Sequence, residues 1–457
     1  MARYYPDYNS TDLQPKKIFS RACPGKRFDS VTYRKYMSML FKKAEEFLCT
    51  QQSREEVIRS KIKILDEYRK RDIKSLYRKK LKEVESDLKA TEIGDYNLDL
   101  LRHELAIRKY YYSSDGNNLN EAMGDLDMSG RYLLKYFVSF ASIVSYMFSD
   151  MNSNLKIYPE SKFPEAFFRN FDFKKYLEEH EVRDSSISEL EHLDNELINH
   201  DLVLIDDPGS ADNYFALKNF LNIHIGRLSS YKKVYQYKKL ISYCMRMRRQ
   251  SKTAIDFDQE IFEHYSVLIE YGLAFGDNEP TIHYNDFRIF IDSALKSGNR
   301  ESAKKFIEFL SAKSDSESSL EILDMGRARL LYDKQHFDEC LETLASVKPV
   351  SETMGMDLYS MKFFCLYDLN HTASALNLLD TFRHHVSYNR QISAQYAESF
   401  KRFINFSKKL LRLRKKPSED KSKKLFEDIT RDNLVSNKRW MLGKLKELEE
   451  QCYDSRP

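Results

Sequence analysis

Lys, Arg and Tyr side chains gather between residues 231 and 249, and they are the groups in this chain best suited to binding chemistry. Cations interleaved with aromatic rings can contact phosphates and stack on bases. On a helix, the apolar residues of the segment share one face that is typical of a core. Three interpretations stay open: a solvated core helix, a site for nucleic acid or another anionic surface, and a site for an acidic protein. The candidate residues are Lys232, Lys233, Lys239, Arg246 and Arg249, of which Lys232, Lys239 and Arg246 are expected to face solvent.

The motifs that carry catalysis or metal binding are incomplete. Pro24-Gly25-Lys26 lacks the partner glycine and the Ser or Thr of a phosphate loop, so it is typical of a turn. Glu189 and His192 have the spacing of a helical carboxylate–histidine metal pair, but a di-metal bundle needs two such pairs and two further carboxylates. His384 and His385 point about 100° apart on a helix, which is poor geometry for chelation. With no nucleophile motif either, the sequence predicts a non-enzymatic protein without metal or cofactor.

Cysteine usage and apolar segments bear on the compartment. The six cysteines form no C-x-x-C pair and have no regular spacing, which favours reduced thiols in a cytoplasm over disulfides or a zinc site. The first residues lack the apolar core of a secretory signal. Residues 133–148 are apolar, but they are fewer than the about 20 that a membrane span needs, and Lys135 and three serines interrupt them. We expect a helix buried on several faces and no membrane partner.

Composition favours an all-α fold. The 457 residues include 13 Gly and 10 Pro, well below the typical usage of about 7% and 5%. Tight turns between strands consume these residue types, whereas helices with short connections do not. Hydrophobic residues at 42% are enough to form a core.

Charge divides the chain into regions. Residues 1–90 carry 23 Lys or Arg against 13 Asp or Glu, a net charge of +10, and residues 91–215 carry 11 against 24, a net charge of −13. Residues 401–457 carry 17 against 9, a net charge of +8. Basic ends around an acidic middle fit an anionic partner, contacts within the chain, or solvated helix faces. We predict a basic helical N-terminal region (1–95), an acidic helical region (96–205), hairpins that lead into repeats (206–283), tetratricopeptide-like repeats (284–390) and basic capping helices (391–457).

Apolar periodicity predicts the individual helices. The segment 53–90 has the longest pattern without Gly or Pro, and it fits a coiled-coil arm, one long surface helix or a helical hairpin. The turn Asp206-Asp207-Pro208-Gly209 precedes a predicted continuous helix over 211–249. Further helices are expected at about 30–48, 98–112, 129–151, 163–180, 186–202, 391–414 and 437–451.

A repeat with a period of about 35 residues occupies 284–382. A tetratricopeptide hairpin needs small or apolar residues at five positions where its two helices approach closely. Ala303, Cys340 and Ala375 take the closest of these positions in three registers. The signature Trp, Leu and Gly of the first helix are missing, and Phe363 stands where a small residue is usual. The full registers are Ile291, Ala294, Ala303, Ile307 and Leu310; Ala328, Leu331, Cys340, Leu344 and Val347; and Phe363, Leu366, Ala375, Leu379 and Phe382.

Three segments together resemble a family of uncharacterised bacterial all-helical proteins with tetratricopeptide-like repeats. They are the early segment from Lys17 to Leu40, the central Arg131-Tyr-Leu-Leu-Lys-Tyr136, and the late Asn437-Lys-Arg-Trp-Met-Leu-Gly-Lys-Leu445 with the single Trp. The resemblance would cover nearly the whole chain, and it implies no activity, cofactor or catalytic residue.

We therefore expect an α-α superhelix of stacked hairpins with a helical N-terminal region. The predicted function is a scaffold or adaptor that binds a protein or peptide partner, because stacked repeats offer extended surfaces. The alternative is a nucleic-acid-associated regulatory protein that uses basic helices within 1–90 or 231–249.

Overall fold

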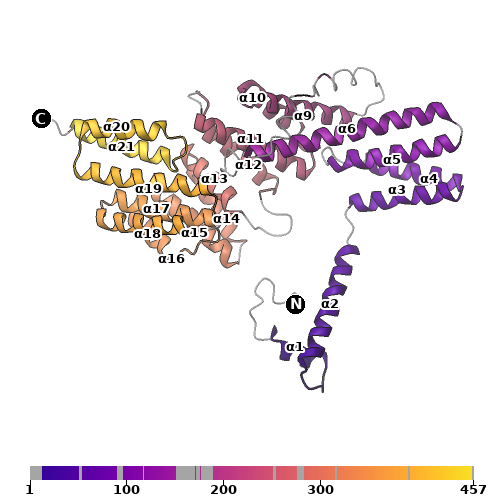
Figure 1. The fold of residues 1–457 in the computed structure, drawn as a ribbon, viewed down its shortest axis with the longest axis horizontal. Coiled ribbons are helices and arrows are strands. Elements are labelled where there is room, and N and C mark those ends of the chain that lie inside the picture. The colour runs from indigo at the N-terminus through magenta and orange to yellow at the C-terminus, as the bar shows by residue number, and fades with distance from the viewer. Residues whose placement is uncertain are drawn as a thin grey trace. The chain divides into compact units, whose positions relative to one another are not determined.

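Helices make up the described part of the chain, and no strand occurs in it (Figure 1). The computed structural model describes residues 13–50, 54–89, 96–116, 118–150, 170, 175, 189–250, 254–274, 283–313, 316–389 and 392–454. This confirms the predicted all-α class. The helix predicted over 163–180 lies almost wholly outside the described residues.

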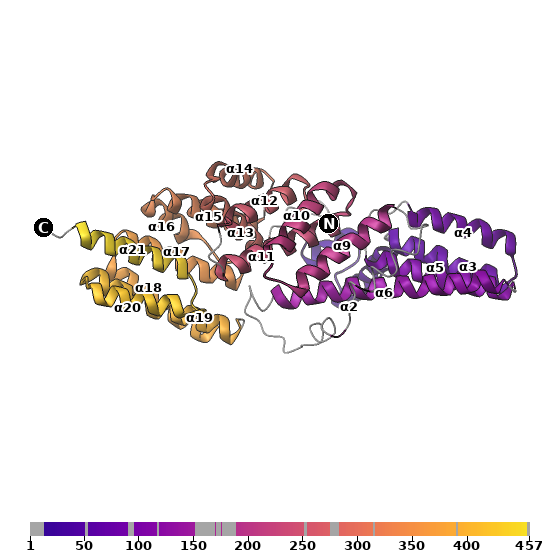
Figure 2. The ribbon, with the colours of Figure 1, turned by 90° about the horizontal axis from the view of Figure 1, so that it is seen from above.

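The chain divides into two compact units, Met1–Ser139 and Phe140–Pro457. In the first unit, α3 and α4 form a hairpin that packs against α5, and the three lie alongside α6 in Figures 1 and 2. The core of this unit includes Ile62, Leu65, Tyr77, Val84 and Leu101. The segment 53–90 is therefore a hairpin and not a coiled-coil arm. The helices are α1 (Pro15–Ala22), α2 (Ser30–Thr50), α3 (Arg54–Lys70), α4 (Lys74–Lys89), α5 (Tyr96–Asp115) and α6 (Leu119–Asp150).

Helix α6 differs from its prediction in length and in burial. It begins at Leu119, ten residues before the predicted start, because its first turns continue the same apolar pattern. We expected residues 133–148 to be buried on several faces, and this expectation is wrong. Leu133, Phe137, Phe140 and Met147 are 37–52% exposed, so α6 presents an apolar face to solvent.

The second unit begins inside α6 and continues with four helices, one of which is buried by the others. They are α9 (Glu189–Asp206), α10 (Ala211–His224), α11 (Ser230–Gln250) and α12 (Phe257–Glu270). The predicted continuous helix over 211–249 is interrupted at Ile225–Arg227 by a turn of 3₁₀ helix, so that α11 folds back against α10 and packs along α12. Residues on all sides of α11 are consequently buried.

Three consecutive hairpins follow, and their first helices α13, α15 and α17 contact one another. Of the fifteen residues predicted to lie at close approaches, all are buried except Leu331 and Leu366, which are half-buried. Ser316 and Ser351 cap the starts of α15 and α17, where each hydroxyl accepts a backbone N–H three residues on. The helices are α13 (Tyr284–Lys296), α14 (Arg300–Ser311), α15 (Glu317–Asp333), α16 (Phe337–Ser346), α17 (Glu352–Asp368) and α18 (Thr372–Tyr388).

The same backbone turn joins the two helices of each hairpin. Gly298, Gln335 and Asn370 adopt positive φ of 80°, 63° and 62°. In each turn the next residue's N–H donates to a carbonyl five residues earlier, at 2.7 Å from Asn299 and at 2.9 Å from His336 and from His371. This is the left-handed cap that ends many helices. These turns recur with the same spacing as Ala303, Cys340 and Ala375.

We expect Gln335→Gly to raise the free energy of unfolding by about 0.5–1 kcal/mol, because glycine adopts positive φ without the steric cost that a side chain carries. The control Lys334→Gly, at φ −82°, should lower it by about 0.5–1 kcal/mol. Urea denaturation of both variants measures the difference. Changes of the same sign would contradict the assigned turn.

Three helices close the chain: α19 (Ala394–Lys415), α20 (Glu419–Arg431) and α21 (Lys438–Asp454). The first turns of α21 reach back to the hairpins. Trp440 stacks on Phe364 at 4.2 Å between ring centroids, and its indole N–H donates to the Tyr332 hydroxyl at 2.8 Å. Lys444 pairs with Asp368 of α17 at 2.7 Å. Of the described helices, none is long and apolar enough to cross a membrane.

Candidate functional site

The lysines predicted to bind an anionic partner lie mostly inside the protein. Lys232 and Lys239 are only 6% and 4% exposed, so the prediction that they face solvent is wrong. The Lys239 ammonium lies 2.6 Å from an oxygen of Asp201, and the Lys232 ammonium lies 3.8 Å from one of Asp194. Both carboxylates belong to α9, which covers the side of α11 that we expected to face solvent.

The remaining candidates do not form a joint surface with these lysines. Lys233 is half-buried, with its ammonium 4.6 Å from the centre of the Tyr271 ring. Arg246 is half-buried, and its guanidinium donates to the Pro208 carbonyl at 2.5 Å. The Arg249 side chain lies outside the described residues.

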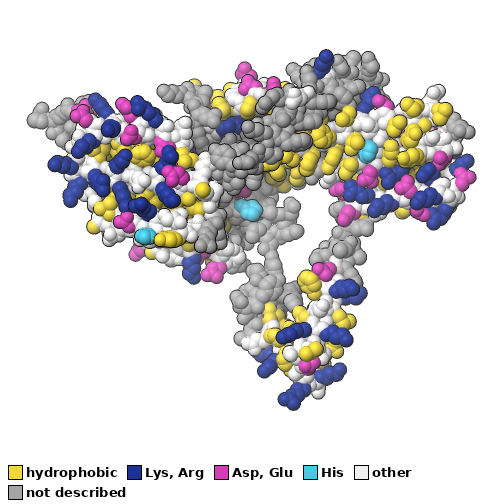
Figure 3. Space-filling view, in the orientation of Figure 1, with side chains coloured by type: hydrophobic (Ala, Val, Ile, Leu, Met, Phe, Trp, Pro, Cys, Tyr) yellow, Lys and Arg dark blue, Asp and Glu magenta, His cyan; other side chains and the backbone are white. Residues whose placement is uncertain are grey.

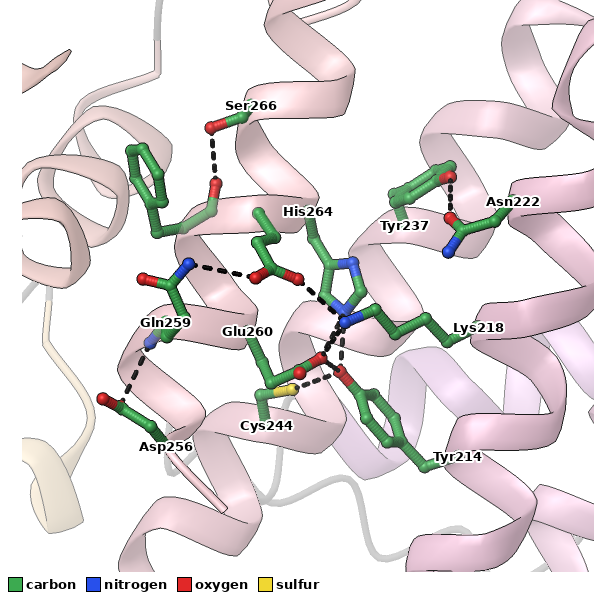
Figure 4. A network of polar contacts seen from close by, with 12 residues as sticks. Tyr214, Lys218, Asn222, Tyr237, Cys244, Asp256, Gln259, Glu260, His264 and Ser266 are labelled. Carbon is green, nitrogen blue, oxygen red and sulfur yellow. Dashed lines mark hydrogen bonds and ion pairs between the residues drawn. The ribbon is translucent and has the colours of Figure 1, made fainter. Parts of the chain in front are cut away.

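A buried polar network joins α10, α11 and α12 around the Tyr214 hydroxyl (Figure 4). The Tyr214 hydroxyl donates its single proton to Glu260. Its oxygen therefore accepts hydrogen bonds from Nε2–H of His264 at 2.8 Å and from the Cys244 thiol at 3.3 Å. Lys218 pairs with Glu260 at 2.6 Å and with Glu263 at 2.9 Å. Tyrosine, cysteine, histidine and carboxylate within contact resemble a catalytic cluster in composition.

The pKa values of this network oppose catalysis by its members. Burial raises the pKa of the Cys244 thiol to about 12, so a nucleophilic thiolate does not form at neutral pH. Burial, with the nearby Lys218 charge, lowers the pKa of His264 to about 3 and keeps the imidazole neutral. Burial also raises the pKa of Tyr214. The network satisfies buried polar groups and joins three helices.

A second set of charged residues, here called the charged row, follows the first helices of the hairpins. Arg288, Asp292 and Lys296 are four residues apart on α13 and thus share one face. Arg329 of α15 lies 2.5 Å from Asp292. The charged row consists of Arg248, Asp258, Arg288, Asp292, Lys296, Arg329, Asp357 and Arg439.

Asp357 of α17 ties the row to the third hairpin. One of its oxygens lies 3.4 Å from Arg288 Nε and 3.2 Å from Arg329 Nη2, and it accepts a hydrogen bond from the Tyr284 hydroxyl at 2.9 Å. At the other end, Asp258 of α12 pairs with Arg248 and, at 2.6 Å, with Arg439 of α21. Burial by itself would raise the pKa of Asp258. The positive charges of Arg248, Lys296 and Arg439 outweigh this effect, so the pKa of Asp258 is lowered. The row therefore runs across α11, α12, α13, α15, α17 and α21.

Within the described residues, Lys296 is the one cation of the row without an ion pair to a carboxylate. Its side chain is exposed, and its ammonium forms no ion pair within the described part of the chain. Desolvation by the surrounding protein still lowers its pKa, and Arg248 and Arg439 add to this effect against Asp292 and Asp258. The five cations of the row exceed its three carboxylates, so the face can attract an anion.

The sequence analysis did not identify the charged row. The local signal was the spacing of Arg288, Asp292 and Lys296, which puts three charges along one side of α13. The contacts that unite the row join residues as far apart as Asp258 and Arg439.

Comparison of the sequence with protein-family models, with curated proteins and with solved structures finds no match.

Proposed function

We propose that this chain is a non-enzymatic helical-repeat scaffold that binds an acidic segment of a protein or peptide partner on the charged row. The observation that carries the proposal is the excess of cations within the charged row, five against three carboxylates, with Lys296 exposed among them. Stacked tetratricopeptide-like hairpins present such first helices as a continuous surface. The recurrent turns at Gly298, Gln335 and Asn370 support this repeat architecture.

The chemistry of the row favours carboxylates as the recognised groups. Arg288 and Arg329 are held in fixed positions by Asp357 and Asp292, so little side-chain freedom is lost when an anion binds. Guanidinium groups bind carboxylates in two-point contacts, and a neighbouring ammonium adds an adjustable donor. A peptide with two or more acidic residues can therefore bridge Lys296 and the guanidinium groups.

We expect Lys296→Glu to abolish capture of the partner from native lysate, because the charge reversal turns an exposed cation of the row into an anion. Tagged wild-type and variant proteins are compared by mass spectrometry of the retained proteins. Lys305→Glu is the matched control, since this lysine is exposed on the second helix α14. Retention of the same partner by both variants would contradict the proposal.

The alternative proposal is association with nucleic acid. Residues 231–249 give this alternative less support than expected, because Lys232 and Lys239 form ion pairs with Asp194 and Asp201. The exposed cations of α2, such as Lys35 and Lys42, still favour it. Binding to generic duplex DNA that falls steeply as salt rises would support this alternative.

A further inference from the structure

Helix α6 carries an apolar seam with the spacing of a coiled coil. Leu119, Met123, Leu126, Gly130 and Leu133 follow one another at alternating intervals of four and three residues. The four large side chains are 66%, 62%, 38% and 44% exposed in that order. Figure 3 shows a continuous hydrophobic band along this helix. Exposed apolar patches of this extent usually mark an interaction site.

Helix α2 carries a second seam with the same intervals. Its members are Tyr33, Met37, Leu40, Ala44 and Phe47. Leu40 is 55% exposed and Phe47 is 61% exposed. Tyr33 and Met37 are half-buried, so the apolar stripe of α2 is most exposed from Leu40 to Phe47.

The two seams match when α2 lies parallel to α6. Tyr33 then lies level with Leu119, and each following member of the α2 seam lies level with the corresponding member of the α6 seam. Ala44 meets Gly130, which puts the two smallest residues opposite each other and lets the helices approach closely. The charges also differ in sign, since α2 contains four basic and two acidic residues and Glu121 and Asp127 of α6 are exposed, whereas Asp125 is buried against Lys109.

The contacts within the first unit set the direction of α2. The start of α3 lies beside the start of α5, where Arg59 is 3.4 Å from Glu104. His103 of α5 lies 3.0 Å from the Ser129 carbonyl, and Lys109 lies 3.4 Å from Asp125, so α5 and α6 are antiparallel. The start of α3 is thus level with the later part of the α6 seam. A 21-residue helix that ends there spans about 32 Å back toward Leu119.

We propose that α2 docks on the apolar seam of α6 in the same chain, as a parallel two-helix pair. The short connection from α2 to α3 gives the α2 seam a high effective concentration at α6. The α2 of a second copy would have to reach the same seam by bimolecular association, in competition with this tethered helix. Docking covers both apolar seams at once and forms a helical N-terminal unit with α2 as its outer layer.

Disulfide trapping in the full chain tests the pairing. In a background with Cys23→Ser, Cys49→Ser and Cys452→Ser, the pair Leu40→Cys and Leu126→Cys should form an intramolecular disulfide under mild oxidation. It is read as a faster monomer band on non-reducing gels. The control pair Lys35→Cys and Leu126→Cys should not form one, because Lys35 lies on the opposite face of α2. A disulfide-linked dimer overturns the proposal, because a second copy then occupies the seam, and equal trapping of both pairs overturns it as well.

Hydrogen exchange gives a second readout without cysteines. Peptides from residues 30–50 should exchange at least about tenfold faster in Leu126→Asp than in the wild type, because the docked helix is released. Phe309→Asp is the control, since Phe309 is 42% exposed in the second unit. Unchanged exchange in Leu126→Asp contradicts the docking. These outcomes do not involve the charged row, so they are independent of the proposed function.

Discussion

We expect Asp201→Ala to lower the free energy of unfolding by about 3–5 kcal/mol, because it leaves the Lys239 ammonium buried without a counter-charge. Lys239 is 4% exposed, and its ammonium lies 2.6 Å from Asp201. Asp201 also accepts a hydrogen bond from the Gln236 amide at 2.9 Å, and this amide is fully buried. Urea denaturation followed by circular dichroism measures the loss.

The same variant should regain stability as the pH rises. Burial lowers the pKa of Lys239 even in the wild type, while Asp201 opposes the shift. Without Asp201 the pKa of Lys239 falls further. At pH values between this lowered pKa and the ordinary pKa of lysine, the unfolded state binds more protons than the folded state. Stability then increases with pH, by up to about 1.4 kcal/mol per pH unit for one group. The deficit relative to the wild type should be smaller at pH 9.5 than at pH 7.

Two controls separate the buried charge from other effects. The double variant Asp201→Leu with Lys239→Met removes both charges and should recover most of the loss, because apolar replacement of a buried pair is often neutral. Asp380→Ala breaks the surface pair with Lys408, where the aspartate is 62% exposed, and should cost less than about 1 kcal/mol. If the double variant is as unstable as Asp201→Ala, the loss comes from packing and the charge argument fails.

The three helical hairpins between residues 284 and 388 could be predicted from the sequence because their signal is local. Ala303, Cys340 and Ala375 recur at the spacing of the hairpins, and each is fully buried. Close helix approach restricts these positions to small residues, so the restriction is visible in the residue types themselves. The turns that carry Gln335 and Asn370 lacked the usual glycine, and their left-handed conformation became evident only in the structure.

Burial of α11 and exposure of α6 could not be predicted for a common reason. Apolar periodicity identifies a face that prefers burial, but it does not say how many elements surround a helix. Lys232 and Lys239 are covered because α9 supplies Asp194 and Asp201 on the side opposite the apolar face. Conversely, the apolar composition of residues 133–148 suggested neighbours on several sides, whereas Leu133 is 44% exposed.

The charged row depends on tertiary structure in the same way. Arg329 contacts Asp292 and Asp357, which lie on two other helices. Burial lowers the pKa of Arg329, but the two carboxylates and the Tyr284 hydroxyl outweigh it and the pKa is raised. Single charged residues on helices usually face solvent, so the sequence offered no reason to group these three. Only the stacking of α13, α15 and α17 brings them together.

We expect Gly326→Ala to lower the free energy of unfolding by about 1–3 kcal/mol through overpacking. A β-carbon at Gly326 of α15 would lie 2.5 Å from Phe287 Cζ and 3.0 Å from Ile307 Cδ1. Phe287 is 1% exposed and packs against Phe306, so its ring cannot move without opening the core between the first two hairpins. Thermal and urea denaturation of the variant measure the effect.

Gly443→Ala is the matched control, because it makes the same change inside a helix where space is open. A β-carbon at Gly443 of α21 meets no atom within 4 Å. Alanine has the higher helix propensity, so this variant should gain about 0.5–1 kcal/mol. The same propensity gain acts at Gly326 and partly offsets the clash, which makes the opposite sign of the two changes the decisive result. A stabilised Gly326→Ala variant would mean that α15 does not approach Phe287 as closely as the stacked hairpins require.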